Sequence, residues 1–123
     1  CGKKVKKDNK VTGNKGETLA VEYLQKKGYK IIERNFRTRF GEIDIVCWDG
    51  KILVFVEVKT KMGHDFGEPE EMVNKRKLSQ VKRMGEVYVQ DKGLGCLCRV
   101  DVVAIVLENN GLIEKLEHYQ AVY

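Results

Sequence analysis

The sequence predicts an α/β domain with a mixed β-sheet, and three observations lead to this prediction. A segment with apolar residues at helical spacing comes first, and three strand-like segments follow it. A second helical segment then precedes an almost continuously apolar run, which is typical of a central strand covered on both faces. The expected order of elements is therefore α-β-β-β-α-β-β.

The first half of the chain contains one expected helix and three expected strands. The helix covers about residues 15–27, where apolar residues form a stripe at helical spacing. The strands are expected at residues 29–37, 41–48 and 51–61. Asp49-Gly50 is a strong signal for a two-residue hairpin turn, so we expect Trp48 to pair with Lys51.

The second half contains one expected helix and two expected strands. The only proline, Pro69, suits the first turn of a helix that runs to about Val89. Residues 97–107 form the apolar central strand, and residues 112–119 alternate in polarity, as an edge strand does.

Length and composition are those of one ordinary globular domain. The chain has 123 residues, of which 42% are hydrophobic and 33% are charged. No apolar stretch approaches the roughly 20 residues that a membrane helix needs. The N-terminal residues are charged and lack an apolar segment, so we expect a cytoplasmic protein without membrane contact.

The net charge of +5 is unevenly distributed. Residues 1–12 contain five lysines and one aspartate, and they are expected to form a disordered basic arm before a single domain over residues 13–123. Within that domain, residues 26–39 contain six lysines and arginines and one glutamate, which predicts a local basic surface.

Two carboxylates on neighbouring strands are the main chemical feature. In the expected hairpin register Asp44 lies opposite Phe55 and Glu42 opposite Glu57, so Asp44 and Glu57 are diagonal neighbours on one face. Two such charges about 5 Å apart repel by roughly 3 kcal/mol at an effective dielectric of about 20. A divalent cation, a shared proton or the nearby Lys59 must offset this repulsion. A one-residue shift in register would place the two carboxylates on opposite faces.

Other charged residues are expected near this pair, although each has an alternative interpretation. Glu17 and Lys77 lie at the margins of the apolar stripes of their helices. Glu17 can instead be a helix-start carboxylate, Glu42 a strand-entry residue, and Lys77 part of a solvated helix face. Glu57 and Lys59 can likewise be an exposed ion pair at a strand end.

Several motifs resemble those of a known family, in order and in spacing, from about residue 13 to the end of the chain. They are Gly16-Glu17, Arg34-Asn35-Phe36-Arg37, Gly41-Glu42-Ile43-Asp44, Phe55-Val56-Glu57-Val58-Lys59, Lys77 and Arg99-Val100-Asp101. The chain thus resembles the YraN-like family of uncharacterised bacterial endonuclease-like proteins. The resemblance implies a restriction-endonuclease-like, PD-(D/E)XK fold, with an αβββαβ core and a mixed central sheet flanked by helices, similar to archaeal Holliday-junction resolvases.

The resemblance also implies a catalytic site. Asp44 and Glu57 would bind Mg²⁺ or Mn²⁺ with the Val58 carbonyl as a third ligand. Lys59 would orient the attacking water, and Glu17 would be an accessory acidic residue. Glu42, Arg99 and Asp101 are further accessory candidates, although structural pairing is the preferred interpretation of Arg99 and Asp101.

The expected function is metal-dependent hydrolysis of phosphodiester bonds in DNA, including branched or structured DNA. DNA is preferred over RNA as the partner, and a homodimer fits an enzyme that makes two cuts. The expected nucleic-acid-binding residues are Lys15, Arg34, Arg37, Arg39, Lys61 and Lys77. The sequence shows no helix-turn-helix, zinc finger or aromatic stacking platform, so recognition by shape is expected. One alternative is a nucleic-acid-binding module of the same fold with little or no catalysis, and another is a scaffold for protein contacts.

Overall fold

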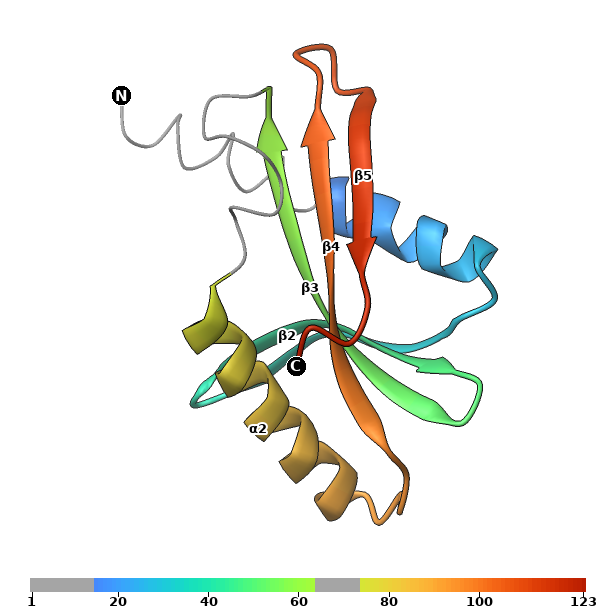
Figure 1. Ribbon diagram of the computed structural model, residues 1–123, viewed down its shortest axis with the longest axis vertical. Helices are drawn as coiled ribbons and strands as arrows, with labels where there is room; N and C mark the ends of the chain where they lie inside the picture. Colours follow the sequence, from blue (N-terminus) through green and yellow to red (C-terminus); the bar gives the residue numbers. More distant parts are fainter. Residues whose placement is uncertain (1–14, 64–73) are drawn as a thin grey trace.

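A five-stranded mixed sheet forms the centre of the protein (Figure 1). The computed structural model describes residues 15–63 and 74–123, so the expected arm at residues 1–12 lies outside the described residues. The strands follow one another across the sheet in chain order. They are β1 (Lys30–Thr38), β2 (Gly41–Asp49), β3 (Ile52–Met62), β4 (Cys98–Leu107) and β5 (Ile113–Tyr119).

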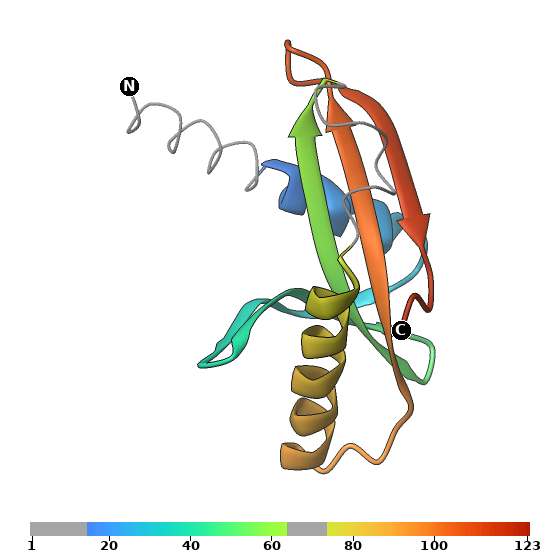
Figure 2. The same cartoon turned by 60° about the vertical axis from the view of Figure 1, so that its left-hand side comes forward.

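A helix covers each face of the sheet. The N-terminal helix, described over residues 15–26, packs on one face, and α2 (Lys75–Asp91) packs on the other (Figures 1 and 2). Alternate residues of β3 belong to the two apolar clusters: Val54 and Val56 face the N-terminal helix, whereas Leu53 and Phe55 face α2. The expected α/β fold with helices on both sides of a mixed sheet is confirmed.

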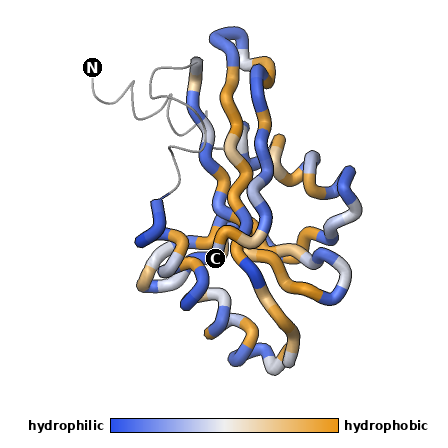
Figure 3. Tube along the Cα trace, in the orientation of Figure 1, coloured by the Kyte–Doolittle hydropathy of each residue, from blue (hydrophilic) through white to orange (hydrophobic). Residues whose placement is uncertain are grey.

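The connection through α2 makes β3 and β4 the one parallel pair, while the other neighbours are antiparallel. β4 is buried along most of its length, as its continuous apolar sequence predicts, and β5 is an edge strand. Figure 3 shows β4 as a mainly apolar strand beside the more polar C-terminal half of β3. Polar side chains therefore lie next to the centre of the sheet along that half of β3.

The expected register of the β2–β3 hairpin is wrong by two residues. Asp49 pairs with Ile52 and Trp48 with Leu53, so the two loop residues are Gly50 and Lys51. Gly50 has φ of +60°, which places glycine at the first loop position as in a type II′ turn. Because the shift is even, every side chain keeps its face. Continued by one step beyond the last pair, the observed register puts Asp44 opposite Glu57 itself.

The second helix also begins later than expected. Asn74 has an extended backbone, and its side chain accepts a hydrogen bond from the Lys77 amide at 3.2 Å. Asn74 is therefore the N-cap of α2, so a helix from Pro69 does not continue into α2. Residues 69–73 themselves lie outside the described residues. Within the described ranges, neither helix is long and apolar enough to cross a membrane.

Candidate active site

The candidate site lies at a fork where β2 separates from β3. Pairing between these strands ends at Ile45 and Val56, and the β1–β2 hairpin then turns away towards α2 (Figures 1 and 2). Past this point the Val58 amide donates a hydrogen bond of 2.8 Å to Asp44 Oδ2. The backbone of β3 thereby holds the Asp44 carboxylate in the fork.

Glu57 is the most buried carboxylate of the fork, with 3% of its surface exposed. Its Oε1 lies 3.3 Å from the Lys59 Nζ and 3.5 Å from the Lys77 Nζ of α2. Its Oε2 is also buried but has no hydrogen-bond partner among the described residues. Buried polar atoms are rarely left unpaired, so a proton donor or a cation is expected at this oxygen.

Asp44 has a strongly perturbed acidity. Burial and the neighbouring Glu57 charge raise its pKa to about 7, although the hydrogen bond from the Val58 amide works in the opposite direction. Glu17 and Glu42 raise it further by smaller amounts. Near neutral pH the fork therefore favours a bound proton or a cation on Asp44, and the charges of Glu57, Glu17 and Glu42 all act on this one carboxylate.

Glu17 comes from the N-terminal helix and is 8% exposed. It accepts hydrogen bonds from Arg34 Nε at 3.3 Å and Asn35 Nδ2 at 2.9 Å, both on β1. The helix lies so close to β3 that a Cβ at Gly16 would overlap the Thr60 side chain. Glu17 thus connects the N-terminal helix to β1 by hydrogen bonds and is not only a helix-start residue. Asn35 was not predicted, although its position between Arg34 and Phe36 in a basic segment is a signal that could have suggested it.

The predicted nucleic-acid-binding residues separate into exposed and buried members. Lys15, Arg34, Arg37 and Arg39 are exposed, and Arg37 forms a 3.5 Å ion pair with Glu42 at the surface. Lys77 is partly exposed beside Glu57, whereas Lys61 is only 6% exposed. The exposed cations lie on the β1–β2 hairpin and the start of the N-terminal helix, and we leave Lys61 out of that surface.

Arg99 and Asp101 belong to a different cluster on the opposite face of the sheet. Arg99 donates to both oxygens of Asp101, at 2.9 and 3.2 Å, and His118 Nε2 lies 2.8 Å from Asp101 Oδ2. Burial alone would raise the pKa of Asp101, but the hydrogen bonds from His118 and Arg99 lower it. The preferred structural pairing is present, and the strand alternation separates it from Glu57. His118 was not predicted as a member of this network.

The donor set of the fork suits a hard divalent cation. Mg²⁺ is usually bound by one or two carboxylates together with waters and substrate phosphates. The described residues contain no group of three or more histidine, cysteine, aspartate or glutamate side chains that could hold a metal. Two carboxylates, one with an unpaired buried oxygen and one with a raised pKa, fit the Mg²⁺ pattern.

Comparison with known sequences identifies relatives that match most of the chain. The sequence model of the "Uncharacterised protein family UPF0102" matches residues 16–105. A UPF0102 protein of Pelotomaculum thermopropionicum is 40% identical over 112 residues, which cover 90% of this chain and 93% of that protein. One from Carboxydothermus hydrogenoformans is 45% identical over 111 residues, covering 89% and 92%. One from Syntrophomonas wolfei is 51% identical over 82 residues, covering 67% and 71%.

Proposed function

The chain belongs to the uncharacterised protein family UPF0102, and from that premise we propose that it is a metal-dependent nuclease that hydrolyses phosphodiester bonds in DNA. The family name assigns no activity, so the proposal depends on the geometry of the fork. A DNA substrate would place the protein in the cytoplasm. Cutting two strands of a branched substrate would require two such sites, as in a homodimer.

The observation that supports the proposal best is the unequal environment of the two Glu57 oxygens. Two ammonium groups contact Oε1, whereas Oε2 is buried and has no partner among the described residues, and the Glu57 charge acts on Asp44. A carboxylate that served only an ion pair would gain nothing from burying its second oxygen without a partner. Mg²⁺ or Mn²⁺ bound to both residues would pair this oxygen and would offset the burial and the repulsion from Glu57 that raise the pKa of Asp44.

Each residue of the fork has a proposed task. Asp44 and Glu57 would hold the ion, with the Val58 carbonyl as a third ligand, and the Val58 amide keeps Asp44 oriented towards β3. A bound divalent ion lowers the pKa of water and stabilises charge on the phosphate. The Lys59 ammonium is partly exposed and lies at the same carboxylate, so it would position the attacking water. Lys77 shares Glu57 Oε1 and would limit the negative charge of the fork before an ion binds.

The surrounding cations would bind the DNA backbone. Arg34, Arg37 and Arg39 are exposed on the hairpin that leaves the fork, and Lys15 is exposed at the start of the described helix. Arginine and lysine contacts to phosphate fix the register of a nucleic acid without reading its sequence. Glu17 would act indirectly, since it holds Arg34 by accepting a hydrogen bond from the guanidinium.

A second candidate function is a nucleic-acid-binding module with little catalysis. The observation in its favour is the pair of ammonium groups on Glu57, because Lys59 and Lys77 together can balance one carboxylate without a metal. In that case the raised pKa of Asp44, about 7, would leave about half of this carboxylate protonated at pH 7, and no ion would be required.

Metal binding and cleavage can be measured separately. We expect Mn²⁺ to raise the thermal unfolding midpoint of the wild type but not of Glu57→Gln or Asp44→Asn, because only a native-state ligand stabilises the fold. With Mg²⁺ or Mn²⁺, labelled four-way and linear DNA should be cut by the wild type, and each substitution should reduce the rate at least about 100-fold, as loss of ion-mediated charge stabilisation does.

Glu86→Gln provides a matched control, since Glu86 is an exposed glutamate of α2 outside the fork. It should retain both metal stabilisation and cleavage. Cleavage that survives Glu57→Ala would come from a contaminant and would end the nuclease proposal. DNA binding that weakens steeply with salt, without cleavage or metal stabilisation in the wild type, would favour the binding module.

A further inference from the structure

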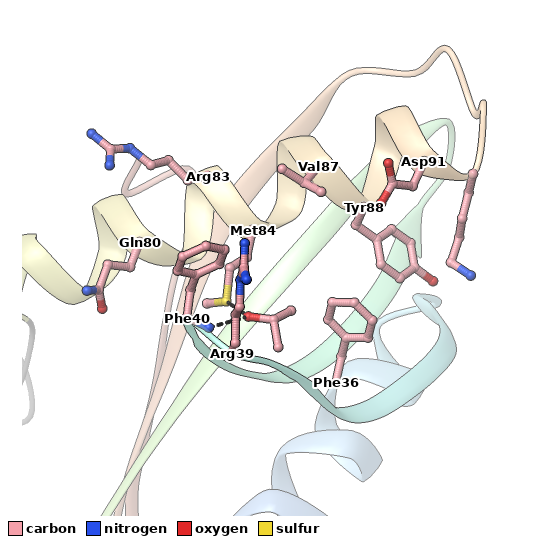
Figure 4. A pocket seen from close by; sticks show the side chains of 11 residues that line it. Phe36, Arg39, Phe40, Gln80, Arg83, Met84, Val87, Tyr88 and Asp91 are labelled. Carbon is pink, nitrogen blue, oxygen red and sulfur yellow. Dashed lines mark hydrogen bonds between the residues drawn. The ribbon is translucent and has the colours of Figure 1, made fainter.

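A groove separates α2 from the β1–β2 hairpin, beyond the acidic fork (Figure 4). Its volume is about 750 Å³, within the range of about 300–1,000 Å³ that is common for ligand sites. Phe36 and Phe40 line it from the hairpin, and Met84, Val87 and Tyr88 line it from α2. The groove is therefore apolar inside and has aromatic rings from two elements.

The aromatic rings of the groove differ in how much they are exposed. Phe36 and Tyr88 pack edge to face with centroids 5.1 Å apart, which fixes the inner wall. Phe40 is 68% exposed, and Val87 is exposed opposite it on α2. A large exposed aromatic residue beside an apolar groove is typical of a surface that binds a partner.

The rim of the groove is cationic. Among the described lining residues, Arg39, Arg83 and Lys92 are positively charged, and Asp91 is the one acidic residue. The Arg39 guanidinium lies over the Phe40 ring, 5.0 Å from its centroid, and Lys92 lies at 5.0 Å from the Tyr88 ring. Cations next to aromatic faces are the combination that binds single-stranded nucleic acids, in which bases stack and phosphates pair with positive charge.

The same helix connects the groove to the fork. Lys77 contacts Glu57, and the lining of the groove begins at Gln80, three residues further along α2. At 1.5 Å per residue this separation is about 4–5 Å along the helix axis. A nucleic-acid strand bound at the fork could thus continue directly into the groove.

We propose that this groove binds unpaired bases of a DNA substrate, with Phe40 as the stacking residue and the rim cations on the phosphates. The inference rests on the proposed function only for the class of substrate. Paired bases do not expose their faces, so the groove would select forks, flaps or junctions with unpaired strands over continuous duplex. A second copy of the chain is a poorer occupant, because a two-fold interface would bring the same cationic rims together.

The test measures binding without divalent ions, so that cleavage plays no part. Fluorescence anisotropy in EDTA would compare a forked DNA that has an unpaired arm with a duplex of equal length. We expect Phe40→Ala to weaken binding of the forked DNA roughly 5- to 150-fold, the range for loss of one stacked base, and to leave duplex binding unchanged. Abasic sites in the unpaired arm should weaken wild-type binding by a similar factor and should have no further effect on Phe40→Ala.

Leu97→Ala is the matched control, because Leu97 is an exposed apolar residue (77% of its surface) that does not line the groove. It should bind both DNAs as the wild type does. The inference is overturned if Phe40→Ala binds the forked DNA as tightly as the wild type does, or if the substitution weakens binding of the forked DNA and of the duplex equally. It is also overturned if light scattering shows that the wild type is a dimer and that Phe40→Ala is a monomer. If the protein prefers forked DNA through Phe40 but never cleaves it, the groove proposal is supported and only the nuclease proposal is contradicted. Cleavage combined with Phe40-independent binding would contradict the groove alone.

Discussion

The Asp44 carboxylate should make the protein less stable as the pH rises, and Asp44→Asn should remove that effect. The folded-state pKa of Asp44 is about 7, above its ordinary value of 3.8, so folding favours the protonated form. The contribution of protonated Asp44 to the stability of the fold is fully present below pH 3.8 and is lost as the pH rises through 7. At 1.4 kcal/mol per pH unit, the wild type should lose about 3 kcal/mol between pH 5 and pH 8 relative to Asp44→Asn.

Urea unfolding at pH 5 and pH 8 in EDTA measures this difference. The single tryptophan, Trp48, is partly buried at the end of β2 and reports the transition by its fluorescence. Asparagine has the shape of aspartate and can still accept the hydrogen bond from the Val58 amide, so the substitution removes mainly the charge. We expect Asp44→Asn to be the more stable protein at pH 8, with an advantage that shrinks at pH 5.

Two outcomes would refute this reasoning. An equal stability difference between wild type and Asp44→Asn at both pH values would mean that Asp44 does not titrate in this range. A pH-dependent gain of the same size in Glu86→Gln, an exposed control, would show that general charge and not the fork is responsible. In buffer without EDTA, Mn²⁺ should cancel the loss at pH 8 in the wild type only, because the ion would take the place of the proton on Asp44.

Three further predictions concern the fold that supports the site. A Cβ at Gly85 would overlap the Phe55 ring, so Gly85→Ala should lower the free energy of unfolding by about 1–3 kcal/mol in urea, despite its better helix propensity. Asn74→Ala removes the N-cap of α2 and should cost about 1 kcal/mol, seen as a lower thermal midpoint. Asp101→Asn removes the buried charge that pairs with Arg99 and should cost about 3 kcal/mol, the lower end for a broken buried pair, because Asp49 still contacts the guanidinium. Because the pKa of Asp101 is lowered, this cost should be full at neutral pH and should shrink as the pH falls below the usual carboxylate range. A variant whose stability equals that of the wild type would contradict the packing, capping or pairing argument on which its prediction rests.

The faces of the central hairpin could be predicted from the sequence, but its register could not. Alternation places Asp44 and Glu57 on one face for any even shift, and the proximity of the two charges agrees with this. The position of the turn depends on which residues contact the rest of the fold. Asp49 stays in the ladder, where Arg99 Nη1 of β4 lies 2.9 Å from its carboxylate. No local pattern contains that contact.

The position of Arg99 and Asp101 could likewise be predicted only in part. The sequence indicates that Arg99 and Asp101 share a face of β4, and they do pair. It does not indicate whether this face is the one that presents Glu57 on β3. In the structure Asp101 faces the N-terminal helix and Glu57 faces α2, so the two carboxylates lie on opposite sides of the sheet.

The groove could not be predicted from either of its walls. Phe36 and Phe40 follow one another in a basic segment, and Tyr88 belongs to the apolar stripe of α2. Each can be an ordinary core residue in its own element. Only the approach of the hairpin to α2, where Thr38 Oγ1 lies 3.2 Å from Met84 Sδ, places the three rings around one cavity.

The sequence by itself determined the elements, their order and the residues that share each face, because helical and strand periodicity are properties of the local backbone. The tertiary structure decided which oxygen of Glu57 is paired, how strongly Asp44 holds a proton, and which cations surround the fork. Burial and charge interactions depend on neighbours from distant parts of the chain. They arise only where β2 separates from β3 and both helices close over the sheet.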